Sequence, residues 1–551
     1  MKYSEQTKKA QVKAMRHLAK VEAEMPVTMA IPGRADSVAN DGGGFSFAIN
    51  SRKALERFLI LGAQSTYYVG AKTSVKDALK SIEAEMKRDP LGAVKLATQI
   101  SEEGRAVKND GAIFVLAIAL TGDNQAAKNY AKEMVPRVCR TATHMFMLVS
   151  YLDEMRGWGR AVRKAVSNWY ETKTVKALEM QMVKYQGRVV SEGSNNKWTH
   201  KDVLRLAHPK ASTEQHGLLY KHAIGKEIPL GSFKLMAAVE RLQAGGMTPN
   251  DMAKLIADNN IPFEAWTPDA LKAKETWVAA LPGMGMTALM RNLARLTASN
   301  VLYDDEALRT VIARLSDVNE IQQGRLHPYS LLLASKVYEQ GHGNKGNLTW
   351  EPIRKVIDAL ETAFYASFAT IVPSGKRILI SVDVSGSMGY GCVNQSGGKS
   401  GDPISCCMAS GVMAMATARV ESNWDIMGFA NSYRKLEVTP RMDLKQVMGV
   451  MQDNNFGSTD CSLPFTWALK NKKNYDTFVV YTDSEANCGQ HPANVLKRYR
   501  KEMNPEARLI VVGLDGRPFS IADPQDAGSL DVVGFDAAVP RFISEFAAGK
   551  L

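Results

Sequence analysis

The segment ILISVDVSGSM (residues 378–388) joins a run of apolar residues to a carboxylate, two hydroxyls and a glycine. The apolar run predicts a buried strand, and Asp383, Ser385 and Ser387 follow at the point where that strand ends. Carboxylate and hydroxyl oxygens in a tight turn are ligands that suit Mg²⁺ or Mn²⁺. Serines in such a turn can also bond their own backbone, so this segment alone leaves a purely structural loop open.

Two later segments favour the metal site. The loop GSTD (residues 457–460) offers a hydroxyl, and an aspartate follows the second apolar run, TFVVYT (residues 477–482). In an open parallel sheet, groups at the carboxyl ends of different strands meet in one crevice. We therefore predict a single divalent ion, Mg²⁺ with Mn²⁺ as the alternative, held by Asp383, Ser385, Ser387, Thr459 and Asp483.

The pattern around these segments predicts a doubly wound α/β domain from residue 371 to the end of the chain. Short apolar runs alternate with amphipathic helical stretches, as this fold class requires. The predicted strands begin at Ile378 and cover residues 424–429, 478–481 and 509–512. The predicted helices cover residues 404–420, 444–451, 493–499 and 539–546.

The first 370 residues are predicted to be helical. Leu148, Tyr151, Leu152 and Met155 follow the spacing of one helix face, and strand-like alternation is nearly absent. About 300 residues of short amphipathic helices favour a stacked α-solenoid over one compact bundle. We expect three parts: an extension over residues 1–40, a helical-repeat module over 41–370 and the α/β domain over 371–551.

Composition and charge suggest the partner and the compartment. The 551-residue chain carries a net charge of +12, while residues 371–551 hold 19 basic and 19 acidic side chains. All of the excess therefore lies in the first 370 residues, which makes a polyanionic partner a candidate. No apolar run is long enough to span a membrane, the first 20 residues lack a signal core, and the six cysteines have no zinc or disulfide spacing. We expect a cytoplasmic protein without membrane attachment.

Two basic helix faces stand out in the helical part. Thr199 can cap a helix, with Asp202 completing a capping box, and on that helix Lys201, Arg205 and His208 fall within about 60° of one another. A second stripe contains Arg160, Arg163 and Lys164; Gly157 and Gly159 can start that helix late and exclude Arg156. Each stripe alone is typical of a solvated surface, but their proximity and the charge excess favour phosphate binding.

The order of the metal motif resembles the metal-ion-dependent adhesion site of von Willebrand factor A domains. Longer segments resemble the Ro autoantigen family, whose members carry a TROVE module of HEAT-like helical repeats closed into a ring by such a domain. This similarity extends from about residue 40 to the end, and it is carried by GAQSTYY (62–68), THMF (143–146), WGRAVRKAVSNWY (158–170), WTHKDVLRLAHPK (198–210), GSTDCSLP (457–464) and HPANVLKRYRKEM (491–503).

The resemblance implies a ribonucleoprotein, a monomeric ring that binds small noncoding Y RNA on its basic outer surface. It also implies that single-stranded ends of misfolded RNA enter the ring cavity, in RNA quality control or decay, with a 3′-exonuclease such as polynucleotide phosphorylase as a further partner. Lys184 and His208 match positions that the family uses for Y RNA. We add His144 from the matching segments, and Lys201, Arg205, Arg160, Arg163 and Lys164 from the two stripes.

Two other functions stay open. The metal could capture a carboxylate of a protein partner, with the helical part as a scaffold. A magnesium-dependent nuclease is a further alternative, although the neighbourhood shows no recognisable nucleophile and base and few carboxylates. The chain departs from the family pattern in the glycine- and serine-rich loop from Gly389 to Gly401, which follows the metal motif, and in its first 40 residues. The loop could restrict access to the ion.

Overall fold

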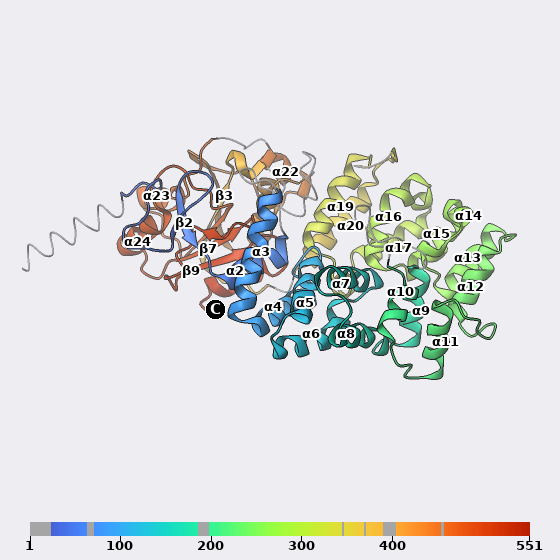
Figure 1. Ribbon diagram of the computed structural model, residues 1–551. Helices are drawn as coiled ribbons and strands as arrows, with labels where there is room; N and C mark the ends of the chain where they lie inside the picture. Colours follow the sequence, from blue (N-terminus) through green and yellow to red (C-terminus); the bar gives the residue numbers. More distant parts are fainter. Residues whose placement is uncertain are drawn as a thin grey trace, which may run out of the picture. The chain divides into compact units, whose positions relative to one another are not determined.

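The computed structural model describes residues 24–62, 71–185, 198–343, 347–368, 371–389, 404–452 and 457–551. The chain forms two compact units (Figure 1). One is the continuous segment Ile82–Ser367, and the other combines Met1–Ser81 with Phe368–Leu551. The second unit is therefore assembled from the two ends of the sequence.

The unit Ile82–Ser367 is built from helices joined by short turns, and helices close in sequence pack against each other, for example α4 on α5, α12 on α13 and α19 on α20. This confirms the prediction of a helical first part. The α-helices are α3 (Ala71–Arg88, which begins in the other unit), α4 (Pro90–Glu103), α5 (Asp110–Thr121), α6 (Gln125–Val138), α7 (Ala142–Met155), α8 (Arg160–Glu171), α9 (Val175–Lys184), α10 (His200–Ala207), α11 (Glu214–Ala223), α12 (Lys234–Gln243), α13 (Pro249–Asn259), α14 (Pro268–Lys272), α15 (Lys274–Ala280), α16 (Met286–Ala298), α17 (Asp305–Leu315), α18 (Val318–Gln323), α19 (Pro328–Gln340) and α20 (Arg354–Ala366).

Side-chain caps determine where several of these helices begin. The carboxylate of Asp89 accepts the N–H of Gly92 at 2.8 Å, and Thr141 and Thr174 cap α7 and α9 in the same way. The capping box predicted at Thr199 and Asp202 is confirmed, because each side chain accepts the backbone N–H of the other residue. No helix in the described part of the chain is long and apolar enough to cross a membrane.

The second unit contains a six-stranded sheet in the order β5-β4-β3-β6-β7-β9, parallel except for the edge strand β5. The strands predicted from the apolar runs are confirmed, whereas β9 had no prediction because its sequence, SLDVV, is short and half polar. The strands are β3 (Arg377–Asp383), β4 (Asn423–Phe429), β5 (Tyr433–Lys435), β6 (Thr477–Thr482), β7 (Arg508–Gly513) and β9 (Ser529–Val533).

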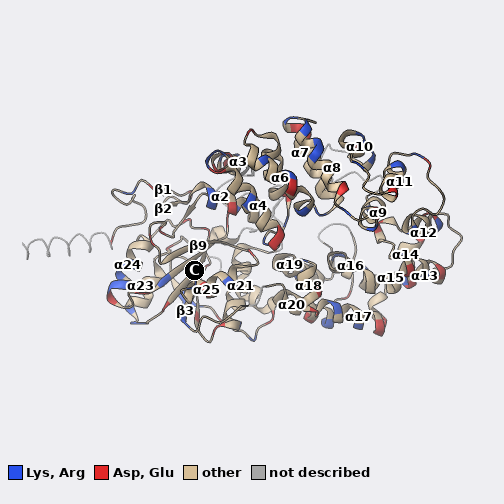
Figure 2. Ribbon diagram, turned by 90° about the horizontal axis from the view of Figure 1, so that it is seen from below, with Lys and Arg blue, Asp and Glu red and all other residues tan. Residues whose placement is uncertain are grey.

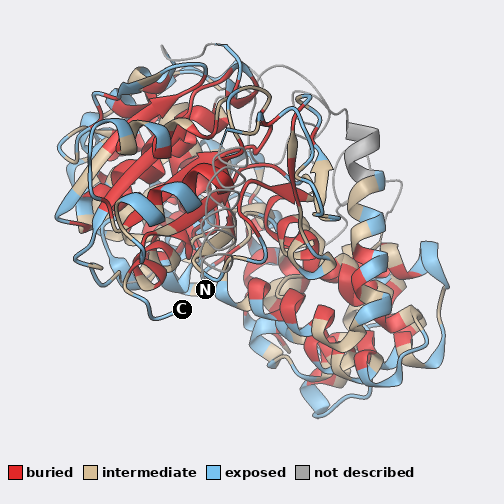
Figure 3. Cartoon of the chain, turned by 90° about the vertical axis from the view of Figure 1, so that its left-hand side faces the viewer, coloured by how far each residue is buried: buried red, intermediate tan, exposed pale blue. Residues whose placement is uncertain are grey.

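Helices cover both faces of this sheet, as the doubly wound prediction requires. On one face, α23 (Leu463–Lys470) and α24 (Pro492–Glu502) pack through Phe465 and Tyr499 onto alternate strand residues such as Phe478. The strand residues between these point the opposite way, where α21 (Cys406–Val420) contacts β3 and α25 (Val539–Ala547) contacts β7 and β9. Figure 3 shows the strands of the sheet buried between these layers. A further helix, α22 (Leu444–Gln452), packs on α21.

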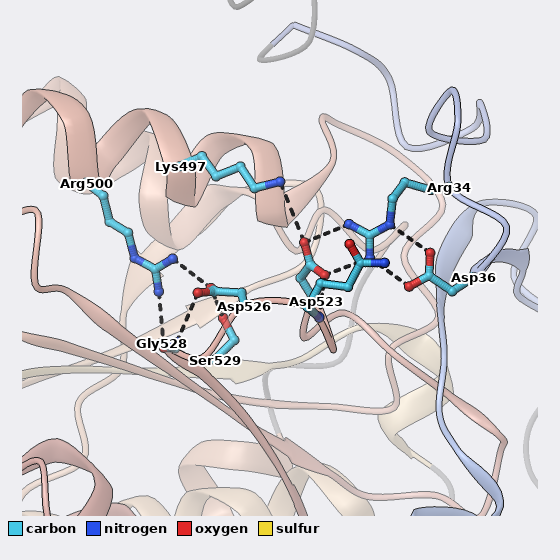
Figure 4. Close-up of polar contacts among 9 residues, drawn as sticks. Arg34, Asp36, Lys497, Arg500, Asp523, Asp526, Gly528 and Ser529 are labelled. Atoms are coloured by element: carbon cyan, nitrogen blue, oxygen red, sulfur yellow. Dashed lines mark hydrogen bonds and ion pairs between the residues drawn. The ribbon is translucent and has the colours of Figure 1, made fainter.

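The N-terminal segment is part of the sheet-containing unit. Strand β2 (Phe45–Ala48) pairs with β1 (Ser37–Ala39) and with β8 (Phe519–Ser520) near the other end of the chain. In Figure 4, the guanidinium of Arg34 forms two hydrogen bonds to the carboxylate of Asp523, at 2.7 and 2.9 Å. Figure 4 also shows an ion pair between Lys497 and Asp523 and another between Arg500 and Asp526.

The helix α2 (Ser51–Leu61) strengthens this attachment. Its Arg57 is fully buried; it donates to the carbonyls of Arg517 and Phe519 and forms an ion pair with Asp531 of β9 at 2.7 Å. The predicted boundary at residue 41 does not coincide with these contacts. Residues 41–62, expected in the helical module, lie in the sheet-containing unit because strand pairing and the buried Arg57 hold them there.

Candidate metal centre and basic surface

The predicted metal site lies where β3 and β6 end. The parallel register pairs Val382 with Tyr481, so the next residues, Asp383 and Thr482, are neighbours across the two strands. The hydroxyl of Thr482 donates to Oδ2 of Asp383 at 2.7 Å. Thr482 was not among the predicted site residues. Its position follows from the strand register, which the sequence alone does not define.

The turn after β3 places the two serines beside the same carboxylate. The N–H of Ser385 donates to Oδ1 of Asp383 at 2.9 Å, and the hydroxyls of Ser385 and Ser387 lie 3.2 Å apart. Burial raises the pKa of Asp483, and a hydrogen bond from the hydroxyl of Ser387 offsets part of this rise. The structure therefore brings together Asp383, Ser385, Ser387 and Asp483, all four of them buried.

The loop that carries Thr459 is tied to the same end of the sheet. The N–H of Thr459 donates to Oδ1 of Asn487 at 2.8 Å, and its carbonyl accepts the N–H of Asn487 at 3.0 Å. The next residue, Asp460, donates its N–H to the carbonyl of Ala430, just beyond β4. Backbone contacts thus fasten the Thr459 loop to the segments that follow β6 and β4, with Thr459 itself buried.

The two aspartates form a site of concentrated negative charge. Burial, and then the neighbouring charge of Asp483, raise the pKa of Asp383 to about 7, and burial also raises the pKa of Asp483. A cation between the carboxylates would remove this repulsion. The donors are carboxylate and hydroxyl oxygens, which are the ligand types of Mg²⁺, so the residues fit the predicted ion.

Two further acids, Glu485 and Asp515, interact with the first pair. Burial, together with the charges of Asp515 and Asp483, raises the pKa of Glu485 to about 9, and Oε2 of Glu485 accepts the N–H of Gly42 at 2.7 Å. Burial and Asp483 raise the pKa of Asp515 to about 7. Within the described ranges, no three His, Cys, Asp or Glu side chains are grouped to hold a metal. The candidate centre therefore depends on hydroxyls as much as on carboxylates.

The loop from Gly389 to Gly401, expected to limit access to the ion, lies almost wholly outside the described residues. Gly389 itself ends the short helix η4 (Gly386–Gly389), which includes Ser387 of the metal motif. Gly386 has open space around its α-carbon, so a methyl side chain would fit there.

The two basic stripes lie on helices that pack against each other. The hydroxyl of Ser167 on α8 donates to the carbonyl of Ala207 at the end of α10, at 2.8 Å. Lys201 and Arg205 on α10, and Arg160 and Arg163 on α8, are all exposed. Figure 2 shows basic residues on both helices. Helix α8 begins at Arg160 after Gly159, so the late start predicted for this helix is confirmed and Arg156 is outside it.

Two of the residues predicted to bind RNA, His208 and Lys164, have different surroundings from the four exposed cations of α8 and α10. Helix α10 ends at Ala207, and His208 follows in the left-handed conformation with φ of 51°, so its direction does not follow the helical spacing used for the stripe. His208 is nevertheless exposed. Lys164 is exposed but forms an ion pair with Glu171 at 3.0 Å, which reduces the charge that it offers to a ligand.

Lys184 and His144 complete the predicted set. Lys184 is half-buried at the last position of α9. His144, in the first turn of α7, is also half-buried, and burial with the nearby charge of Arg140 lowers its pKa to about 4. The imidazole of His144 is therefore neutral at physiological pH and can contact RNA as a hydrogen-bonding group but not as a cation.

Beneath α10, a cluster of aromatic side chains holds the helix in place. His200 is buried, and its Nδ1 lies 3.0 Å from the hydroxyl of Tyr170 on α8. Its ring also contacts Trp169 and Phe146. Burial lowers the pKa of His200 to about 4, so this histidine is a neutral part of the core.

Comparison with known proteins agrees with this architecture. The sequence-family model of the TROVE domain matches residues 38–236 and 268–337, and that of the Ro60 vWA domain matches residues 377–547. The RNA-binding protein RO60 of Deinococcus radiodurans is 37% identical over 93% of this chain and 96% of its own length. The protein of the same name from Caenorhabditis elegans is 32% identical, over 93% and 90%.

A solved structure shows the same fold. The crystal structure of the Deinococcus radiodurans RO (RSR) protein matches with a TM-score of 0.66 and 35% identity, over 91% of this chain and 100% of that one. The chain is thus a TROVE-domain protein with a C-terminal vWA domain. It belongs to the Ro60 family, as the quoted segments indicated. Both relatives are named as RNA-binding proteins and not as enzymes.

Proposed function

We propose that this chain binds a small structured RNA of the Y RNA type on a surface formed by α8 and α10. The observation that carries the proposal is the packing of these two helices with Arg160, Arg163, Lys201 and Arg205 all exposed. Four cations on adjacent helices match the closely spaced phosphates of an RNA stem. The names of the two relatives support RNA as the polyanion.

The family resemblance extends this proposal to a role in RNA quality control or decay. Single-stranded ends of misfolded RNA would enter the cavity of a ring, and a 3′-exonuclease such as polynucleotide phosphorylase would act on them. The cytoplasm suits this role, and the five described cysteines are all free thiols.

Reversing two charges on α10 tests the RNA-binding surface. The variant Lys201→Glu with Arg205→Glu should bind a stem-containing RNA about 10- to 100-fold more weakly, because two phosphate contacts become repulsive. The slope of log K against log salt should decrease by about two. Fluorescence anisotropy across a salt series measures both quantities.

The matched control places the same charge change elsewhere in the helical unit. Lys254 on α13 and Arg309 on α17 are exposed, so Lys254→Glu with Arg309→Glu alters the net charge equally. This control should retain most of the affinity. Equal losses in the two variants, or binding that does not respond to salt, would contradict the proposed surface.

We further propose that the end of the sheet binds Mg²⁺, with Mn²⁺ as a substitute, through Asp383, Ser385, Ser387, Thr459 and Asp483. The bound ion would supply a coordination position for an oxygen of a partner. Thr482 and the N–H of Ser385 hold the carboxylate of Asp383 in a fixed orientation. The site then serves to dock a protein partner.

Titration with Mg²⁺ tests this site. At 100 times the dissociation constant, Mg²⁺ should stabilise the wild type by about 2.7 kcal/mol. Asp383→Ala should abolish this stabilisation and leave RNA affinity unchanged, whereas Glu437→Ala, an exposed carboxylate in the same unit, should behave as wild type. Calorimetry and thermal unfolding provide the measurements. Magnesium-dependent RNA cleavage that is lost in Asp483→Ala would instead favour the nuclease alternative.

A further inference from the structure

The loop that carries Asp483 joins β6 to α24 and covers residues 483–491; we call it the Asp483 loop. It is irregular, and its first four residues are buried. A buried irregular backbone needs hydrogen-bond partners from other parts of the chain, because neither a helix nor a sheet supplies them. Ser484 adds to this need. Its φ of 63° is a left-handed conformation, which a residue other than glycine keeps only where its surroundings hold it.

Partners for this buried stretch come from the N-terminal segment, residues 25–48, which belongs to the same unit. The hydroxyl of Ser46 on β2 donates to the carbonyl of Ser484 at 2.8 Å. The side-chain amide of Asn40 donates to the carbonyl of Ala486, also at 2.8 Å. Asn40 and Ser46 are buried and lie 3.2 Å apart through Nδ2 and Oγ. The two side chains therefore act together and hold the Asp483 loop at two of its carbonyls.

Glycines allow the two segments to approach this closely. A β-carbon on Gly44 would lie 2.0 Å from the carbonyl oxygen of Ala486, and one on Gly42 would lie 2.8 Å from that of Glu485. The N–H of Gly44 donates to Oδ1 of Asn40 at 2.8 Å, which orients the amide that reaches the loop. A larger residue at position 44 would displace the loop without removing any side-chain donor.

The far end of the Asp483 loop is attached to the same segment. The N–H of Val27 donates to the carbonyl of Gly489 at 3.0 Å. Between the two attachments lies Asn487, which forms the two hydrogen bonds to Thr459 described above. The N-terminal segment thus holds the stretch of chain that aligns two of the five predicted ligands, Asp483 and Thr459.

We propose that Asn40 and Ser46 are positioning residues of the metal centre and set its affinity for the divalent ion through the Asp483 loop. The proposal rests on the proposed Mg²⁺ site and adds the N-terminal segment to it. Partners that orient a metal ligand without touching the ion contribute about 10- to 100-fold to metal affinity. Because coupling between two sites is reciprocal, the bound ion in turn stabilises the attachment of the N-terminal segment.

Variants that each remove one hydrogen bond to the loop test the affinity. Ser46→Ala and Asn40→Ala should each bind Mg²⁺ about tenfold more weakly than the wild type in isothermal titration calorimetry. Ser46→Thr retains the hydroxyl and should restore most of the affinity. The matched control is Ser37→Ala on the neighbouring strand β1, which removes a serine hydroxyl that accepts the N–H of Ile31. This control should bind Mg²⁺ as the wild type does.

Two further measurements separate positioning from a general loss of structure. Gly44→Ala keeps every side-chain donor and displaces the carbonyl of Ala486, so it should weaken Mg²⁺ binding at least as much as Ser46→Ala. In the wild type, hydrogen exchange within residues 40–48 should slow about tenfold when Mg²⁺ saturates the site, and Asp383→Ala should show no such slowing. Thermal unfolding without Mg²⁺ establishes that each variant is folded.

The outcomes distinguish this inference from the proposed metal site. A wild type that binds no Mg²⁺ would overturn the metal site and this inference with it. Wild-type binding that persists unchanged in Ser46→Ala and Asn40→Ala would overturn the positioning role alone. An equal loss in Ser37→Ala would also overturn it, because the effect would then be a general loosening of the segment. If the variants do not fold, the exchange of the wild type decides: slowing by Mg²⁺ supports the inference, and unchanged exchange overturns it.

Discussion

The two candidate sites of this protein depend on charge in opposite ways. At the end of the parallel sheet, Asp383 and Asp483 are buried and repel one another, and their positions follow from strand register and backbone hydrogen bonds. On α8 and α10 the cations are exposed, and only the helical spacing and the packing of two helices arrange them. A single substitution at the buried metal site should therefore abolish ion binding. On the exposed surface, each substitution of a cation should lower the affinity for RNA by a further increment.

The largest effect should come from a buried charge of the sheet-containing unit. Arg57→Ala leaves Asp531 without its ion-pair partner, and the carbonyls of Arg517 and Phe519 without their donor. Loss of one partner of a buried pair costs about 3–5 kcal/mol of unfolding free energy. Urea unfolding gives the free energy, and hydrogen exchange at β9 shows where the loss occurs.

A half-buried cation on the same helix provides the contrast. Lys53→Ala removes a partly exposed ion pair with Glu56 and should change the free energy of unfolding by about 0.5 kcal/mol or less. If Arg57→Ala cost as little as Lys53→Ala, the distinction between fully buried and partly exposed charge would not hold for this unit.

A smaller effect is expected at the start of α10. Thr199→Ala removes the capping box with Asp202 and should cost about 1 kcal/mol, because Thr199 satisfies an N–H in the first turn. Hydrogen exchange of the α10 amides should increase, and affinity for stem RNA should fall only slightly. Thr199→Ser retains the hydroxyl and should restore both. Unchanged exchange in Thr199→Ala would mean that packing on α8 alone holds the helix.

The last effect concerns a partly exposed ion pair and depends on pH. Arg377 donates two side-chain hydrogen bonds to Asp476, at 2.6 and 2.9 Å, and holds the pKa of this carboxyl at about 2. Because the folded pKa lies below the unfolded one, the stabilisation is present above about pH 4 and is lost as the pH falls towards 2.

Asp476→Asn tests this pH dependence directly. Since Arg377 is half exposed, solvent screening reduces the stabilisation to about 1 kcal/mol at neutral pH. The difference in unfolding free energy between wild type and Asp476→Asn should shrink from pH 7 to about pH 3. A difference that stays constant over this range would show that the variant removes hydrogen bonds whose strength does not depend on ionisation.

Much of the sheet-containing unit could be predicted because each of its main strands is marked by an apolar run within a single short segment of sequence. The apolar runs of β3, β4, β6 and β7 are buried on both faces, and such runs are readily seen in a sequence. Strand β9 and the small sheet of β1, β2 and β8 were not predicted, since short strands with polar residues carry little signal. Their stability comes from partners hundreds of residues away, such as the pairing of Phe47 with Ser520.

The sequence by itself determined the class of fold, the order of the metal motif, the capping box of α10 and the basic character of the helical part, because each depends on residues close together in the chain. Only the tertiary structure placed Thr482 beside Asp383, turned His208 out of the helical stripe, and assigned Arg57 to the sheet-containing unit. It also joined Asn40 and Ser46 to the loop that carries Asp483. Strand register, helix ends and contacts between distant segments decide these features, and none of them is encoded within a single segment.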